Sequence, residues 1–174
     1  ENDAPQHFLR LLGRVAERWA IDAPDTSRPR QKMLPLAPLP RTYGDRLLAI
    51  GDAAGLVKPT TGGGIYYSLV SAALAADVLI QALSRSDLSA ARLAPYERRW
   101  RERLSAEFQA QLELRLVAHR MSDMDIEQLF ELARTDGVMP IVRRAASFNR
   151  HRKLIVELLK HPPVRQIILR RLAF

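Results

Sequence analysis

Apolar residues recur at helical spacing through most of the chain, between short polar or proline-rich segments. The pattern predicts an amphipathic helix over residues 5–20, an alanine-rich helix over residues 65–83 and a long helix over residues 88–121. Farther along, it predicts a helix that begins at Ser122 and stops at Gly137 and Pro140, then helices over residues 141–159 and 164–172. The chain is therefore expected to be mostly helical.

The long helix predicted over residues 88–121 has the most regular apolar face. Aromatic and leucine side chains follow one another at four-residue spacing, while Arg and Glu residues fill the other positions. The residues on this face are Tyr96, Trp100, Leu104, Phe108, Leu112 and Leu116. Such a face is predicted to pack into the core of a domain.

Two segments are predicted to be extended. Residues 46–50 form a short apolar run that ends at Gly51-Asp52, which is typical of a buried strand followed by a turn. Residues 31–40 contain too many prolines for a central strand, so they are predicted to form an edge or connecting strand. Since a glycine-rich segment and the alanine-rich helix come next, residues 46–84 read as strand, glycine-rich loop and helix.

The composition narrows the chemistry. With 47% apolar residues the chain can bury a core, and because it has no cysteine, disulfides, thiolate metal sites and thiol nucleophiles are excluded. The four histidines share no metal-type spacing, and no Walker or G-x-S-x-G motif occurs, so no metal site is expected. The apolar stretch 65–83 contains Ser68, Ser71, Asp77 and Gln81, which favours a buried helix over a membrane span.

The positive charge is concentrated at one end of the chain. The net charge is +8, and residues 140–174 hold nine Lys or Arg residues against one acidic residue, Glu157. A one-sided basic segment is typical of a protein with an anionic partner such as phospholipid, nucleic acid or an acidic protein. An arginine-rich helix face that only meets water is the alternative.

The glycine-rich segment carries the candidate chemistry. Asp52 follows the predicted strand at the end where ligands bind in α/β sheets, and its carboxylate can accept hydrogen bonds from sugar or ribityl hydroxyls. Gly51 and Gly55 allow close approach of the backbone to a ligand. The triplet Gly62-Gly63-Gly64 precedes a long helix, so free N–H groups and the positive end of the helix dipole can face an anion or a carbonyl.

This segment resembles the second flavin-binding motif of the para-hydroxybenzoate hydroxylase superfamily, and within it most closely that of the geranylgeranyl reductases. The likeness is carried by Gly51-Asp52-Ala53-Ala54-Gly55, by Pro59 and by Thr61-Gly62-Gly63-Gly64-Ile65-Tyr66-Tyr67. It implies that Asp52 binds the ribityl chain of FAD and that residues 59–65 border the isoalloxazine. The cofactor-binding residues implied are Gly51, Asp52, Pro59, Gly62, Gly63, Gly64 and Ile65. Many family members have an acidic residue at the position of Gly63.

The resemblance also implies that half of the cofactor site lies outside this chain. A complete member holds the ADP pyrophosphate with a G-x-G-x-x-G loop, and the eight glycines here contain no such spacing. The N-terminal dinucleotide-binding half of the same protein is therefore expected upstream. The chain begins with Glu1-Asn2-Asp3, and no signal-peptide pattern occurs there. The catalytic residues are expected upstream too, and none is named.

The fold class expected is an α+β fragment, mostly helical, in which the end of an FAD-binding α/β domain is followed by a C-terminal helical domain. Residues 1–45 are interpreted as the end of a substrate-binding domain, residues 46–84 as the second FAD-binding motif and residues 85–174 as the helical domain. Within the motif, Lys58 is interpreted as a solvated loop residue, and Tyr66 and Tyr67 as core aromatics.

The function implied is that of an FAD-dependent oxidoreductase in lipid biosynthesis, which reduces double bonds of isoprenoid (geranylgeranyl) chains with NAD(P)H or another electron donor. A monooxygenase or halogenase of the same superfamily is the first alternative, and a non-enzymatic basic helical module is the second. The lipid is the expected partner, and nucleic acid is not favoured. A cytoplasmic location is expected, with binding to the membrane surface through the basic C-terminal helices weighed against their packing on the helical domain.

Overall fold

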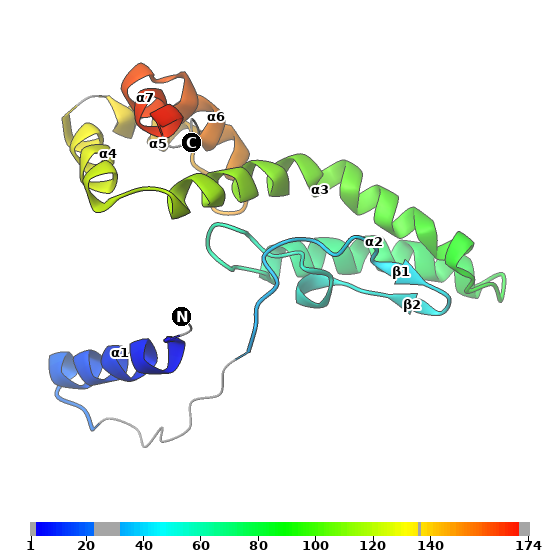
Figure 1. Cartoon of the computed structure of the whole chain (residues 1–174). Coiled ribbons are helices and arrows are strands. Elements are labelled where there is room, and N and C mark those ends of the chain that lie inside the picture. Colours follow the sequence, from blue (N-terminus) through cyan, green and yellow to red (C-terminus); the bar gives the residue numbers. More distant parts are fainter. Residues whose placement is uncertain (1–2, 23–31, 136, 171–174) are drawn as a thin grey trace. The chain divides into compact units, whose positions relative to one another are not determined.

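A computed structural model describes residues 3–22, 32–135 and 137–170 of the chain. The chain divides into two compact units, Glu1–Met33 and Leu34–Phe174 (Figure 1). The described residues are mostly helical and contain one small antiparallel sheet, which agrees with the expectation of a mostly helical α+β chain.

The first unit contains helix α1 (Ala4–Trp19), which confirms the helix predicted over residues 5–20. Pro5 stands in the first turn, where a missing backbone N–H costs nothing. The helix ends at Ala20, whose φ of 48° is left-handed and whose N–H donates to the carbonyl of Ala16. No residue of α1 is buried, and its large apolar side chains are exposed: Phe8, Leu9, Leu11 and Trp19.

The second unit begins with an irregular segment and a short hairpin. Strands β1 (Tyr43–Gly44) and β2 (Leu47–Leu48) pair antiparallel, with Tyr43 opposite Leu48 and Gly44 opposite Leu47. The prediction of a buried strand over residues 46–50 is wrong in both length and burial, because Leu47 and Ile50 are 57% and 40% exposed. A strand is buried where other elements cover both of its faces. Helix α3 (Ala90–His119) packs against this hairpin, and no further strand pairs with it among the described residues.

The strand predicted over residues 31–40 is also wrong. Residues 32–40 contain no strand, and Gln31 lies outside the described residues. Three prolines, Pro35, Pro38 and Pro40, have no N–H to give to a ladder. The segment is held by single bonds, in which the N–H of Leu39 donates to the carbonyl of Ala54 and Arg101 donates to the carbonyls of Leu39 and Pro40.

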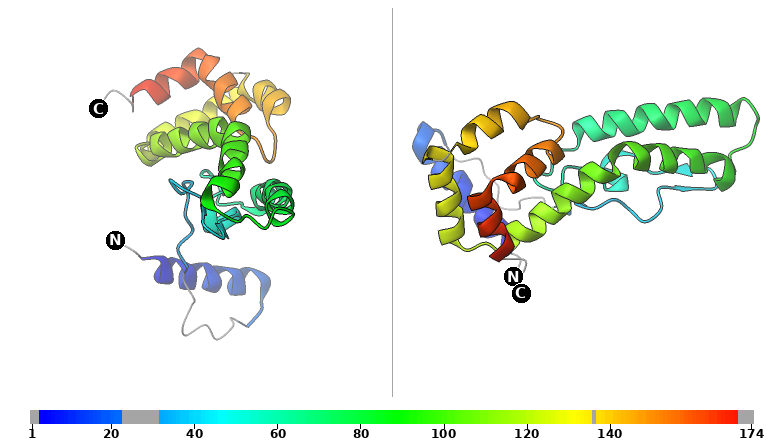
Figure 2. Two further views of the ribbon diagram at one scale, coloured as in Figure 1. Left: turned by 90° about the vertical axis from the view of Figure 1, so that its right-hand side faces the viewer. Right: turned by 90° about the horizontal axis from the view of Figure 1, so that it is seen from above.

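Helices α2 (Ile65–Leu83) and α3 lie side by side, joined by a short turn (Figures 1 and 2). Both confirm the predicted helices, and the main core lies between them. The fully buried side chains of this core include Tyr67, Leu93, Tyr96, Trp100 and Phe108. The predicted apolar face of α3 is therefore confirmed as far as Phe108, whereas Leu116 is exposed near the C-terminal end of the helix.

Four shorter helices gather at the C-terminal end of α3, as Figure 1 shows: α4 (Asp123–Thr135), α5 (Val138–Ala145), α6 (Arg152–Lys160) and α7 (Pro162–Arg170). Ser122 caps α4 as predicted, since its N–H donates to Asp125 at 2.7 Å and its hydroxyl accepts from the N–H of Asp125. A second apolar cluster joins these helices to α3 through Val117, Val138, Val164 and Ile168.

The single helix predicted over residues 141–159 is wrong, because residues 146–151 interrupt it between α5 and α6. This α5–α6 loop contains neither glycine nor proline that would announce a break. Its backbone instead bonds to distant segments: the carbonyls of Phe148 and Asn149 accept from Lys58 and Tyr67, and the N–H of His151 donates to Glu107. Tertiary partners have replaced the helical hydrogen bonds here.

Candidate functional site

The candidate site is the glycine loop, defined as residues 51–64, together with the first turn of α2. Gly51, Gly55 and Gly62 all have positive φ, of 52°, 69° and 75°. At Gly55 a Cβ would collide with the carbonyl oxygen of Ala37, and at Gly51 it would collide with the hydroxyl of Ser68. Glycine at these two positions is thus required both by backbone conformation and by close packing.

The fold brings Asp52 to the beginning of α2. A Cβ on Gly64 would overlap the Oδ1 atom of Asp52, so the carboxylate lies directly against Gly64. The N–H groups of Gly63, Gly64 and Ile65 donate no hydrogen bond within the described part of the chain. The Ile65 side chain is 82% exposed and Asp52 is exposed as well. An acceptor and a row of donors therefore lie together at an open surface.

Behind the glycine loop, the main chain is anchored to α3. Pro59 is fully buried, and its carbonyl accepts a hydrogen bond from Arg115 at 3.2 Å. The Thr60 hydroxyl donates to Gln111 at 3.0 Å and also lies 3.0 Å from Nδ1 of His151. The loop therefore has one face fixed by α3 and the α5–α6 loop.

The side chain of Lys58 is buried, although it was expected to face solvent. Its side chain is only 5% exposed; Nζ donates to the carbonyl of Phe148 at 2.6 Å and lies 3.9 Å from the centroid of the Phe148 ring. A Cβ on Gly63 would lie 3.4 Å from Cε of Lys58, so the lysine runs along the glycine triplet. The interpretation of Lys58 as solvated is wrong, because a segment 90 residues farther along the chain covers it.

A buried polar network that the sequence analysis did not find joins these segments. The hydroxyl of Tyr67 donates to the carbonyl of Asn149 at 2.7 Å and accepts from Gln111. Gln111 also donates to Glu107 at 2.7 Å, and Glu107 in turn accepts from the N–H groups of His151 and Arg152. Gln111 falls on the apolar face of α3, and a polar residue on that face is the signal that would have predicted the network.

Two buried tyrosines act as neutral donors in this part of the fold. Burial raises the pKa of Tyr67 to about 12, against a smaller opposing effect of the hydrogen bond from Gln111. Burial likewise raises the pKa of Tyr96 to about 12, and its hydroxyl donates to the carbonyl of Ala49 at 2.8 Å. Tyr67 is confirmed as a core aromatic, while Tyr66 is half-buried and packs edge-on against it.

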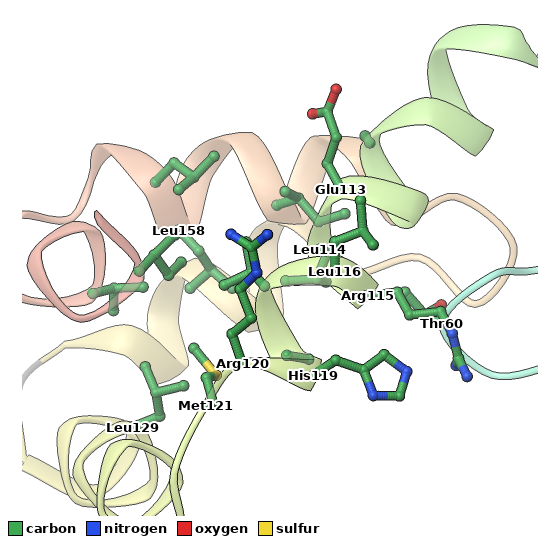
Figure 3. A pocket seen from close by; sticks show the side chains of 17 residues that line it. Thr60, Glu113, Leu114, Arg115, Leu116, His119, Arg120, Met121, Leu129 and Leu158 are labelled. Carbon is green, nitrogen blue, oxygen red and sulfur yellow. The ribbon is translucent and has the colours of Figure 1, made fainter. Parts of the chain in front are cut away.

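An apolar pocket of about 860 Å³ lies beside the glycine loop (Figure 3). Thr60 and Leu129 stand at opposite ends of it in this view, with Leu114, Leu116 and Leu158 between them. Its walls come from the C-terminal half of α3 and from α4, α6 and α7. The size and lining suit a long apolar chain.

Helix α2 is long and apolar enough, by length and composition alone, to cross a membrane. The core helices of globular proteins meet the same criteria. In the structure one face of α2 packs on α3, whereas Ile65, Leu69, Ile80 and Leu83 are exposed. No group of three metal-binding side chains occurs in residues 3–22, 32–135 and 137–170.

A sequence model of the lycopene cyclase protein family matches residues 9–136. Since this match spans more than half of the chain, the chain belongs to that family. The glycine-rich motif resembles that of geranylgeranyl reductases, and the match to lycopene cyclases was not expected from it.

Several curated relatives are reductases by name. The digeranylgeranylglycerophospholipid reductase of Methanocaldococcus jannaschii is 39% identical over 94 residues, which are 54% of this chain and 24% of the relative. A protein of the same name from Methanothrix thermoacetophila is 31% identical over 130 residues, which are 75% of this chain and 33% of the relative. The resemblance to geranylgeranyl reductases is thereby confirmed, and the chain spans about a quarter to a third of the length of these relatives.

Proposed function

We propose that this chain is the C-terminal part of an FAD-dependent oxidoreductase that reduces double bonds in the isoprenoid chains of a lipid. The observation that carries the proposal is the contact of Asp52 with Gly64 at the start of α2, beside the free N–H groups of Gly63 and Ile65. The names of the relatives support a reductase of isoprenoid lipids. The residues predicted from the sequence to bind the cofactor supply the acceptor and the donors.

The geometry fits one half of a flavin site. The Asp52 carboxylate is exposed and able to accept a hydrogen bond from a ribityl hydroxyl. The donors at Gly63, Gly64 and Ile65, with the positive end of the α2 dipole, suit the electron-rich pyrimidine edge of the ring. FAD, when bound, supplies hydride transfer, and this chain supplies orientation and electrostatics. In this proposal an upstream dinucleotide-binding half of the same protein holds the ADP end, and the electron donor is NAD(P)H or another reductant.

The first test is the affinity for FAD of the full-length protein. Replacing Asp52 with Ala is expected to weaken FAD binding by about 1.5–3 kcal/mol, the range for a hydrogen bond to a charged group. Fluorescence titration measures this, and Asp77→Ala, an exposed carboxylate on α2, is the control that leaves the affinity unchanged. If both variants bind FAD as the wild type does, Asp52 is only a turn residue.

The product distinguishes the proposal from the other reactions of related flavoproteins. Reduction of one double bond adds two hydrogens, cyclisation of a polyene is an isomerisation that adds none, and a monooxygenase adds oxygen. Mass spectrometry of an isoprenoid lipid after incubation with the full-length protein and a reductant separates the three. The lycopene cyclase family match makes cyclisation the second candidate. A product of unchanged mass would favour it over reduction.

We also propose that the protein is cytoplasmic and works at the membrane surface. A cytoplasmic enzyme that acts on a membrane lipid needs access to the membrane surface, and the positive charge of residues 140–174 suits an anionic leaflet. In the described part of this segment, Val164, Ile167 and Ile168 are buried and Leu169 is exposed. Part of the apolar face of α7 is therefore used in packing, and the exposed basic residues are the better candidates for contact with lipid headgroups.

A further inference from the structure

A second hollow is also lined by α3 and α6 and has the opposite chemistry to the apolar pocket. This cationic cleft, of about 720 Å³, is walled by the beginning of α2, the middle of α3 and the α5–α6 loop with the first turns of α6. Tyr66 and Tyr67 line it from α2. Its four cationic side chains are Arg103, Arg150, Arg152 and Lys153.

The carboxylates in the cationic cleft are already engaged. Glu107 accepts from the N–H groups of His151 and Arg152, at 2.5 and 3.0 Å. Glu157 pairs with Lys160 at 2.7 Å and with Arg144 at 3.8 Å. The hydrogen bond from Lys160 lowers the pKa of Glu157, so this carboxyl is ionised at neutral pH. Its negative charge is paired with the charge of Lys160.

The cations have fewer partners. Arg103, Arg152 and Lys153 form no ion pair with any described residue, and Arg150 contacts only the hydroxyl of Tyr66, at 3.5 Å. Like charges around one hollow repel each other unless an anion lies between them. Glu107 attracts Arg150 and Glu157 attracts Lys153, but four cations face these two carboxylates, so the cleft keeps an excess of positive charge.

Three of the four cations stand on a main chain that is held by hydrogen bonds to other segments. The α5–α6 loop is fixed at its carbonyls by Lys58 and Tyr67 and at its N–H groups by Glu107. Arg150, Arg152 and Lys153 thus project from a backbone already ordered by tertiary bonds. Ordering the backbone in advance lowers the entropy that a bound anion must overcome.

We propose that the cationic cleft binds the phosphate of an amphiphilic lipid whose chain occupies the neighbouring apolar pocket. Arg and Lys donate charge-assisted hydrogen bonds to phosphate oxygens, and guanidinium groups do so in pairs. Both hollows use α3 and α6: the cleft takes Arg152 and Lys153 from α6, and the pocket takes Ile155 and Leu158. The phosphate site stands on these residues alone, whereas its assignment to a lipid rests on the proposed function.

The test compares two triple variants with the same change of charge. Arg150→Gln, Arg152→Gln and Lys153→Gln remove three cations of the cleft; Arg98→Gln, Arg143→Gln and Arg165→Gln remove three exposed cations that do not line it. Calorimetric titration of the full-length protein with glycerol phosphate and with a monomeric short-chain phosphatidic acid gives the affinities. The cleft variant should bind both about tenfold or more weakly, and the control should bind as the wild type. Equal losses in the two variants would overturn the proposal, because they would reflect net charge alone.

Three further measurements serve as controls: thermal unfolding, the comparison of the two ligands, and phosphate binding by Asp52→Ala. All six side chains are exposed, so thermal unfolding should show both variants folded; Lys153→Gln alone, with a smaller loss of affinity, repeats the test should the triple variant not fold. The phosphatidic acid should bind more tightly than glycerol phosphate, and equal affinity would overturn the lipid assignment in favour of a free phosphate. Asp52→Ala should weaken FAD binding and leave phosphate affinity unchanged, so a failure of the proposed flavin function and a failure of the phosphate site are distinguishable.

Discussion

The glycine loop and the α5–α6 loop meet at Lys58 and Tyr67, yet they are held by different means. The glycine loop owes its shape to its own backbone, with glycines at positive φ and bonds such as that from the N–H of Gly62 to the carbonyl of Lys58. The α5–α6 loop has no such residues and is held by side chains from α2, α3 and the glycine loop itself. A conformation encoded locally is visible in a sequence, whereas one imposed by distant partners is not.

The largest effect is expected from adding a methyl group to the glycine loop. In Gly55→Ala the Cβ meets the carbonyl of Ala37 and the left-handed backbone is strained, so a loss of about 3 kcal/mol or more in unfolding free energy is expected. Gly137→Ala is the matched control, with a similar φ of 70° and nothing within 4 Å of its Cβ. Urea denaturation should show a loss of about 1 kcal/mol there. Equal losses would mean that the glycine loop yields and is not fixed by packing.

A smaller effect is expected when the α5–α6 loop loses its anchor. Glu107→Ala removes the acceptor of two backbone N–H groups and of Gln111, so the unfolding free energy should fall by about 1.5–3 kcal/mol. Hydrogen exchange at the amides of His151 and Arg152 should become faster. Glu113 is an exposed carboxylate of α3 that, among the described residues, accepts a hydrogen bond only from Gln109, so Glu113→Ala should change the free energy by less than about 0.5 kcal/mol. An unchanged exchange rate in Glu107→Ala would show that the α5–α6 loop holds its own shape.

The smallest effect concerns alkaline pH. Tyr67 and Tyr96 each have a pKa of about 12 in the folded protein, against 10.0 for the unperturbed group, so the folded state keeps its protons longer. The stability that these protons provide is present below pH 10 and is lost as the pH rises from about 10 to 12. By pH 11 the loss should be on the order of 1 kcal/mol for each tyrosine, because the unfolded groups are then largely deprotonated and the folded ones are not. Tyr67→Phe with Tyr96→Phe should flatten this part of the pH profile, and an unaltered profile would assign the slope to other groups.

Much of the fold follows from local patterns in the sequence. The periodicity predicts α2 and α3 closely because each buries one apolar face. Ser122 marks the start of α4, of which Leu129 and Leu132 are only partly buried. The candidate site is also predictable in part, since glycines at positive φ leave a signature that the sequence shows directly. The roles of these residues toward a flavin stay a prediction.

The errors have a common cause. The strand predicted over residues 46–50 could be buried only if further strands or helices covered it on both faces, which depends on distant segments. The helix predicted over residues 141–159 is interrupted where the main chain bonds to Lys58, Tyr67 and Glu107. Lys58 was taken for a solvated residue because its cover comes from Phe148, far away in the chain. The sequence by itself determined helices α1 to α4, the glycine loop and the likeness to geranylgeranyl reductases. Only the tertiary structure decided how the α5–α6 loop joins that loop and which cations gather in the cleft, because hydrogen bonds and charge contacts between distant segments leave no periodic trace in the sequence.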